Sequence, residues 1–195
     1  MKVLFVNCCI RDKDSRTLIL STAFLKKLKS KYPNAYIKEV TLYKENLKPF
    51  LYDDIKYRDS LIENGNFDDE IFKYSKDALD SNIVVIASPY WDLSFPSLLK
   101  CYIEHLFVNN LTFKYEGTKA IGLSSISKVI LLSTSGGLMN DKHLSYLYDA
   151  FSFISSKDIR KYHQYVEFLD VLNKNDSIKV LDKATNELDE IIKDL

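Results

Sequence analysis

Three short stretches of the chain carry residue types suited to ligand binding. Residues 15–17 offer two hydroxyl groups and a guanidinium beside a predicted helix start. Residues 90–93 form an aromatic-rich loop after a buried apolar run, and residues 134–137 place two glycines directly after another such run. Glycines let a backbone approach a ligand closely, and loops that follow parallel strands are where open α/β sheets bind ligands. The sequence therefore predicts ligand contacts at these three stretches.

The first stretch is typical of an anion site. A short apolar strand over residues 3–7 leads into a helix that Ser15 is expected to cap, and unpaired amides and the positive end of the helix dipole meet at such a point. Arg16 adds a charge with bidentate geometry for phosphate. The chain has neither a GxGxxG motif nor a P-loop lysine, so what remains suits a single terminal phosphate. An ordinary capped helix with a surface arginine is the alternative.

The elements that position these stretches alternate along the chain. Apolar, β-branched runs predict strands over residues 3–7, 35–42, 83–87, 128–133 and 165–171. Helical periodicity predicts helices over residues 15–31, 67–79, 96–106, 141–154 and 177–192. Strands that alternate with helices favour a parallel sheet covered on both faces.

The fold class follows from this alternation. We predict one α/β domain over residues 1–195, a flavodoxin-like three-layer sandwich with a five-stranded parallel sheet in the order 2-1-3-4-5. The strand over residues 35–42 is expected near an edge. Residues 43–66 form a long polar connection, which is open to three interpretations: a lid, an interface element or a partly helical segment.

Composition limits the partners and the compartment. Lys and Arg together number 27, as do Asp and Glu, so the net charge of zero gives no electrostatic footprint for nucleic acid or an anionic membrane. No apolar run reaches the ~20 residues of a membrane span. Three cysteines fit a reducing compartment, and we expect a cytoplasmic protein. Cys8 and Cys9 are expected to be small buried thiols and not a redox pair.

Three motifs in order resemble one known family. The chain reads VLFVNCC near its start, then SPYWDLSFPSLLKCYIEHLF, LTFKYEG and a strand that ends in TSGG. This combination resembles the FMN-dependent NADH:quinone oxidoreductase and azoreductase family, over nearly the whole chain. The resemblance implies a flavodoxin-like homodimer with the flavin near the dimer interface. It also implies hydride transfer from NADH or NADPH to FMN, and then to a small-molecule quinone or azo/aromatic acceptor.

The resemblance also implies which residues bind the cofactor. They are a phosphate loop at Cys9, Ser15, Arg16 and Thr17, a ring loop at Pro89, Tyr90, Trp91, Asp92 and Leu93, and a second ring loop at Thr134, Ser135, Gly136 and Gly137. Because the flavin carries the chemistry, no catalytic side chain is expected. His143 and His163 lack partners at metal-ligand spacing, so no metal site is expected either.

The sequence departs from the family pattern at several of these positions. Cys9 stands where Ser is common, Arg16 stands where Gln is usual, and Ser135 replaces an arginine. The triplet Tyr-Trp-Asp replaces Met-Tyr-Asn. Trp91 either lies beside the flavin ring or is a packing aromatic. Asp92 would repel an anionic reduced flavin, so we expect its side chain to point away or its backbone to face the ring.

Two other functions remain open at this stage. One is a flavodoxin-type electron carrier that serves protein partners, against which the neutral net charge argues. The other is a binding module that kept the fold and lost the flavin.

Overall fold

A five-stranded parallel sheet forms the centre of the computed structural model, which describes residues 1–195. The sheet order is β2-β1-β3-β6-β7. These strands are β1 (Lys2–Asn7), β2 (Tyr36–Thr41), β3 (Ile83–Ala87), β6 (Lys128–Thr134) and β7 (Arg160–Val166). Strand β3 is buried along its whole length, as its continuous apolar run predicts for a central parallel strand.

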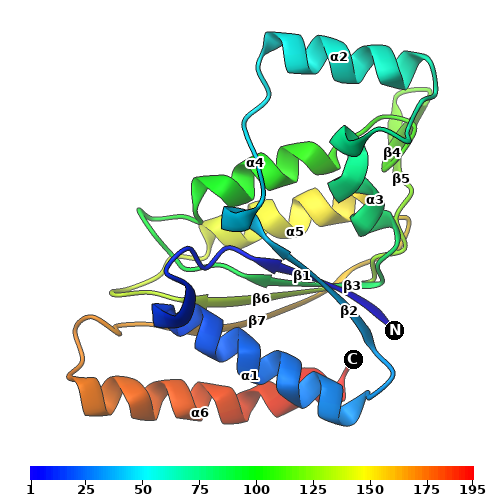
Figure 1. Cartoon of the computed structure of the whole chain (residues 1–195). Coiled ribbons are helices and arrows are strands. Elements are labelled where there is room, and N and C mark those ends of the chain that lie inside the picture. The colour runs from blue at the N-terminus through cyan, green and yellow to red at the C-terminus, as the bar shows by residue number, and fades with distance from the viewer.

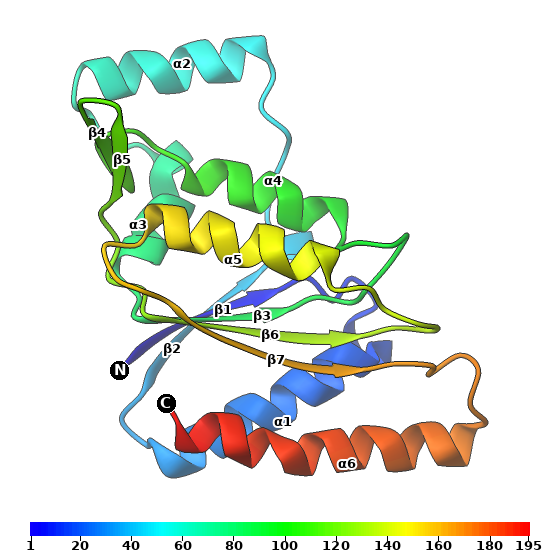
Figure 2. The same ribbon diagram turned by 180° about the vertical axis from the view of Figure 1, so that it is seen from behind.

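Helices cover both faces of this sheet (Figures 1 and 2). Helices α1 (Arg16–Lys31) and α6 (Lys174–Lys193) lie on one face. Helices α3 (Lys73–Leu79), α4 (Ser97–Leu106) and α5 (Lys142–Ile154) lie on the other. The result is a three-layer sandwich.

Alternate residues of each central strand feed two separate cores. In β1, Leu4 and Val6 pack with the buried side chains of α3, α4 and α5, whereas Val3 and Phe5 pack with those of α1 and α6. This division follows from the period of two along a strand, which sends successive side chains to opposite faces.

The flavodoxin-like α/β fold with a parallel sheet is confirmed, and the predicted strand order matches only in part. Two strands in addition to the predicted five, β4 (Phe113–Glu116) and β5 (Lys119–Gly122), form an antiparallel hairpin outside the main sheet. The main sheet therefore reads 2-1-3-6-7 in chain numbering. Strands of four residues show little periodicity in a sequence, so neither was among the five predicted strands.

The last strand lies earlier than predicted. The apolar residues of 165–171 suggested a strand there, but β7 spans Arg160–Val166, with Arg160 opposite Lys128 and Val166 opposite Thr134. Strand β7 lies at the edge of the sheet and pairs only with β6, so much of it is exposed. Its sequence, RKYHQYV, is therefore mostly polar and contains no apolar run that would mark it as a strand.

The closing helix also begins earlier than expected. Asn173 caps it, because its side-chain Oδ1 accepts a hydrogen bond from the Asp176 N–H at 3.0 Å. The helix therefore begins at Lys174, three residues before the predicted start at residue 177. Competing Asn, Asp and Ser side chains at neighbouring positions made the sequence signal ambiguous.

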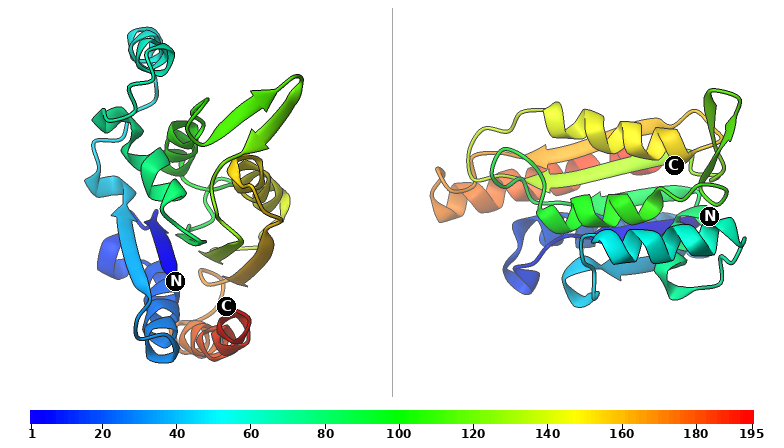
Figure 3. Two further views of the ribbon diagram at one scale, coloured as in Figure 1. Left: turned by 90° about the vertical axis from the view of Figure 1, so that its right-hand side faces the viewer. Right: turned by 90° about the horizontal axis from the view of Figure 1, so that it is seen from above.

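Residues 43–66 contain a helix that stands apart from the sandwich. Helix α2 (Tyr52–Glu63) has no buried residue and lies beyond α3 and α4 (Figures 1 and 3). Near the middle of this helix, the Tyr57 hydroxyl donates to Asp69 Oδ2 at 2.6 Å and links the helix to the segment that follows it. The helix predicted over residues 67–79 begins only at Lys73, after the 3₁₀ turn Glu70–Phe72.

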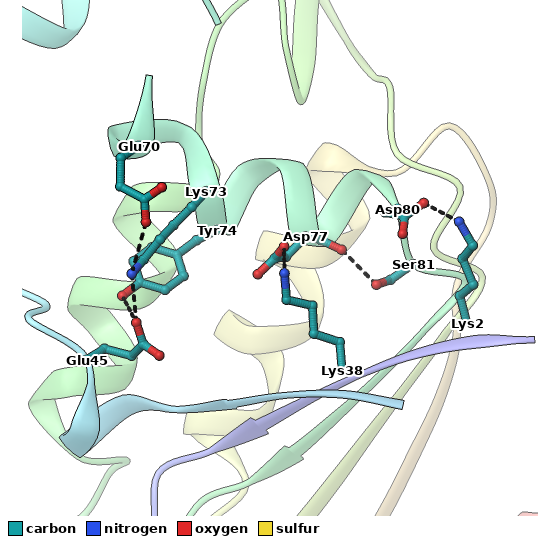
Figure 4. Close-up of polar contacts among 9 residues, drawn as sticks. All are labelled: Lys2, Lys38, Glu45, Glu70, Lys73, Tyr74, Asp77, Asp80 and Ser81. Carbon is teal, nitrogen blue, oxygen red and sulfur yellow. Dashed lines mark hydrogen bonds and ion pairs between the residues drawn. The ribbon is translucent and has the colours of Figure 1, made fainter. Parts of the chain in front are cut away.

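Polar contacts connect α3 to β2 and to the segment that follows β2 (Figure 4). Lys73 Nζ donates to Glu45 Oε2 at 2.7 Å, and Glu45 also accepts from the Tyr74 hydroxyl at 3.1 Å. Lys38 of β2 pairs with Asp77. The contacts of Glu45 hold the segment between β2 and α2 against α3.

No helix of the protein has the length and apolar content needed to cross a membrane.

Candidate functional site

A cavity of about 400 Å³ lies at the carboxyl-terminal edge of the sheet. The ends of β3 and β6 and the start of α1 meet there. Nine of the predicted binding residues line it: Ser15, Arg16, Thr17, Pro89, Tyr90, Trp91, Asp92, Thr134 and Gly136. Stretches that are up to 121 positions apart in the sequence are thus brought to one place by the parallel sheet. The volume is within the range of about 300–1,000 Å³ that small-molecule sites occupy.

The start of α1 presents unpaired backbone donors to this cavity. Ser15 caps the helix, because its Oγ accepts from the Leu18 N–H at 3.3 Å. The N–H groups of Arg16 and Thr17 have no acceptor within the protein. The Thr17 and Thr134 hydroxyls lie 2.7 Å apart and are buried, so they join the helix start to the end of β6. This end of the cavity therefore has the chemistry of an anion site.

The Arg16 side chain bonds to a loop that the sequence did not connect with the site. Its Nη1 donates to the Leu169 carbonyl and its Nη2 to Asp170 Oδ1, both at 2.7 Å. The guanidinium thus lies at the cavity with two of its donors already in use. The phosphate contact assigned to Arg16 stays a prediction.

Cys9 lies behind the cavity and does not line it. The residue is fully buried, its N–H donates to Asn7 Oδ1 at 3.0 Å, and its Sγ lies 3.7 Å from the Ala87 carbonyl oxygen. Burial, above all, raises the pKa of the Cys9 thiol to about 11. Cys8 and Cys9 are both free thiols. The geometry gives Cys9 a packing role beneath the helix start.

The loop after β3 makes a tight two-residue turn. The Trp91 N–H donates to the Ser94 carbonyl and the Ser94 N–H to the Trp91 carbonyl, both at 2.8 Å. Between them, Asp92 and Leu93 have φ angles of 50° and 65°, in the left-handed region that non-glycine residues rarely adopt. Asp92 lines the cavity, whereas Leu93 faces solvent with 74% of its surface exposed. Backbone strain of this kind concentrates at functional sites.

Tyr90 connects the two strand-end loops. Its N–H donates to the Thr134 carbonyl at 2.9 Å, and its hydroxyl accepts from Asn140 Nδ2 at 2.7 Å. On its other side lies the buried His143, with ring centroids 4.9 Å apart. Burial lowers the pKa of His143 below its usual range. The tyrosine ring is therefore held in a fixed position at the cavity wall.

The loop after β6 is held by the loop after β7. The Ser135 N–H donates to the Val166 carbonyl at 2.9 Å, and the Leu169 N–H donates to the Ser135 carbonyl at 3.1 Å. The Asp170 N–H donates to the Gly136 carbonyl at 3.1 Å. Ser135 is buried, and neither it nor Gly137 lines the cavity.

A side chain at position 136 would displace the Asp170 carboxylate. A Cβ atom at position 136 would lie 2.1 Å from Asp170 Oδ2. The N–H groups of Gly136 and Gly137 have no acceptor within the protein. Because Gly136 lines the cavity, its N–H is available to a ligand there.

Three lining residues escaped the sequence analysis: Arg11, Asp14 and Asp170. Arg11 and Asp14 lie in the polar loop before Ser15, and the Arg11 guanidinium lies 5.6 Å from the centre of the Trp91 ring. Both residues lie in the loop after β1, and the position of this loop at the end of a parallel strand could have predicted them as site residues. Asp170 follows β7, and its approach to Arg16 depends on tertiary structure alone.

The residues present fit a flavin mononucleotide. Unpaired amides and hydroxyls lie at the helix start, where a phosphate would be held. Trp91 and Tyr90 line the part of the cavity that loops after β3 and β6 enclose, where aromatic faces suit a planar ring system.

Comparison with known proteins agrees with this geometry. A family model described as flavodoxin-like fold matches residues 1–192. The FMN-dependent NADH:quinone oxidoreductase of Clostridium perfringens (strain SM101) is 32% identical over 184 residues, which cover 92% of each chain. A protein of the same name from Caldicellulosiruptor saccharolyticus is 30% identical over 189 residues, which cover 93% of this chain and 92% of the relative.

Solved structures share the fold. The azoreductase from Bacillus anthracis str. Sterne superposes with a TM-score of 0.83 at 24% identity, with both chains fully covered. An FMN-dependent NADH-azoreductase from Bacillus anthracis str. Ames Ancestor, in complex with FMN, gives a TM-score of 0.80 at 21% identity over 98% of this chain and 97% of the other. The family resemblance noted in the sequence is thus confirmed, and the chain belongs to the flavodoxin-like family that includes the FMN-dependent NADH:quinone oxidoreductases.

Proposed function

We propose that this protein is an FMN-dependent oxidoreductase that uses NADH or NADPH to reduce quinones or azo/aromatic compounds. The observation that carries the proposal is the convergence of the α1 start and two strand-end loops on one cavity. The chain also belongs to a family whose relatives are named for FMN, NADH and quinone. When bound, FMN supplies the hydride chemistry, and the protein supplies binding, orientation and electrostatics.

The chain's own groups divide the work between the two ends of the cavity. At one end, the Arg16 and Thr17 amides and the Ser15 and Thr17 side chains hold the phosphate. At the other end, Tyr90, Trp91 and the loop that contains Gly136 hold the ring system. Free amides beside the ring would stabilise negative charge there. The same proposed binding set includes Cys9, Leu93, Ser135 and Gly137. Cys9 acts through packing, and Leu93, whose side chain faces solvent, acts through its backbone, as do Ser135 and Gly137.

The net charge of zero and the neutral character of quinones agree with small-molecule partners and with no role for nucleic acid.

We place the protein in the cytoplasm because its cysteines are few and free. We also take residues 1–195 as one domain, since both cores lie against the same sheet.

The proposal includes a homodimer. Leu51, the residue before α2, and Tyr52, its first residue, are 71% and 73% exposed. Adjacent exposed apolar side chains of this size are typical of a surface that another protein covers. A groove of about 400 Å³ beside α2 is lined by apolar side chains that include Phe50, Ile55 and Phe107. A second copy of the chain would cover these side chains.

The test is the visible spectrum of the purified protein, followed by mass identification of the released flavin. We expect a yellow protein that releases FMN and oxidises NADH or NADPH rapidly with a soluble quinone, without any partner protein. A protein that stays colourless after incubation with FMN would indicate the flavin-free module instead. Turnover only in the presence of a protein partner would indicate the carrier.

A further inference from the structure

We propose that Asp170 is a specificity-determining residue that weakens the hold of the cavity on a phosphate group by competing with it for Arg16. This inference rests on the proposed function, because the phosphate is that of FMN. None of the sequence motifs includes Asp170, which the fold brings to the cavity from the loop between β7 and α6.

The Asp170 carboxylate touches both walls of the cavity. Its Oδ1 accepts from Arg16 Nη2 at 2.7 Å. Its Oδ2 lies where a side chain at Gly136 would begin, 2.1 Å from a Cβ at that position. Its own N–H donates to the Gly136 carbonyl at 3.1 Å, which fixes the residue in this place. A carboxylate is thus held between the α1 start and the second ring loop.

The charges around the cavity leave no cation in excess for a phosphate. The lining has two arginines and three aspartates: Arg11, Arg16, Asp14, Asp92 and Asp170. Arg11 lies over Trp91, and Arg16 pairs with Asp170. A phosphate dianion must therefore share Arg16 with a carboxylate of like charge. Like charges at short range disfavour each other by an amount that grows as water is excluded.

The direction of the effect follows from the second bond of Arg16. Its Nη1 donates to the Leu169 carbonyl at 2.7 Å, and this bond does not need Asp170. Loss of the carboxylate charge therefore leaves the guanidinium anchored and weakens the bond that competes with a phosphate for Nη2. It also removes one negative charge from the lining.

The test compares two flavins that share the ring and differ in the phosphate. FMN and riboflavin are titrated into the apoprotein, and binding is followed by flavin fluorescence, for the wild type, Asp170→Asn and Asp182→Asn. We expect Asp170→Asn to bind FMN about tenfold more tightly, the size of effect that one nearby charge produces, with riboflavin affinity unchanged within about twofold. Asp182→Asn, which makes the same charge change at an exposed position of α6, should match the wild type.

Several results would overturn the inference. FMN affinity that is unchanged or weaker in Asp170→Asn would mean that the carboxylate positions Arg16 or has no effect. An equal change for both flavins would mean a structural role. If the wild type binds neither flavin, it is the proposed function that fails. If Asp170→Asn does not fold, Asp170→Ser serves the same comparison.

The salt dependence of wild-type FMN binding gives a second test that needs no variant. With the lining charges nearly balanced, FMN affinity should change by less than about twofold between low and moderate salt. A steep loss of affinity with added salt would show an uncompensated cation at the phosphate and would contradict the inference.

Discussion

Arg16 illustrates how one side chain can belong to a site and still be occupied elsewhere. It is the first residue of α1, so its position beside the free amides follows from the sequence. Its bonds to Leu169 and Asp170 do not, because these partners lie more than 150 positions away. Local sequence places a backbone, whereas tertiary structure decides where a long, flexible side chain ends.

Replacement of Arg16 tests whether its side chain contributes to phosphate binding. We expect Arg16→Ala to weaken FMN binding about tenfold, because a charge-assisted hydrogen bond is lost and Asp170 is left without its partner. Riboflavin affinity should be unchanged. Titration of the apoprotein with each flavin measures both. Lys13→Ala, which removes a positive charge from the same loop outside the cavity lining, is the control. Equal FMN affinity in the wild type and Arg16→Ala would remove Arg16 from the phosphate site.

At the scale of elements, the buried strands, most of the amphipathic helices and the alternating edge strand β2 were predictable, whereas β7 and the short hairpin strands were not. The strands β1, β3 and β6 and the helix α1 lie within a residue or two of their predicted bounds, because each buries a continuous or periodic apolar set. The edge strand β7 and the hairpin of β4 and β5 bury less and carry weaker patterns.

The candidate site divides in the same way. Its backbone contributors lie at strand ends and a helix start, which the sequence indicates directly. The lining residue Asp170 comes from a loop whose place depends on the misjudged end of β7. Leu93 lies in the predicted loop but faces solvent, because the chain reverses within two residues there.

A glycine in the tight turn at residues 91–94 should stabilise the protein, whereas glycine substitutions usually destabilise. Leu93 has a φ of 65°, a conformation that strains side chains with a Cβ and suits glycine. We expect Leu93→Gly to raise the free energy of unfolding by up to about 1 kcal/mol, as measured by urea denaturation. Val171→Gly is the control, since Val171 is equally exposed without a positive φ. That variant should lose stability through the added entropy of its unfolded chain. Loss of stability in both variants would show that the turn is unstrained.

At the scale of the whole molecule, α2 is the feature that the monomer alone does not explain. We expect the double variant Leu51→Ser/Tyr52→Ser to dissociate the proposed homodimer, because it removes exposed apolar surface beside the groove. Light scattering coupled to size exclusion measures the mass. Tyr36→Ser, which removes an exposed tyrosine from β2, should leave the mass unchanged. A wild type that is monomeric at every concentration would end the homodimer proposal.

The stability of the whole fold should fall as the pH drops from 7 to 5. Burial lowers the pKa of both His105 and His143. The unfolded chain, in which histidine has a pKa of about 6.5, therefore binds more protons than the folded chain in this range, and protonation favours unfolding. Carboxylates whose pKa is lowered by their partners, such as Glu45, contribute only at lower pH.

Urea denaturation at pH 7, 6 and 5 tests this expectation. The variant His105→Gln/His143→Gln should show a flatter dependence on pH than the wild type, and the exposed His163→Gln should not. A wild-type stability that is constant over this range would mean that neither imidazole is kept neutral by the fold.

The loops around the cavity are braced by main-chain hydrogen bonds, at Trp91 with Ser94 and at residues 135–137 with residues 166–170. Such bonds do not depend on side-chain identity. Leu93 and Leu138, both more than 70% exposed beside these braces, can therefore be exchanged while the frame that holds them stays in place. Substitution at either leucine should therefore change the surface of the protein and leave the shape of the cavity unchanged.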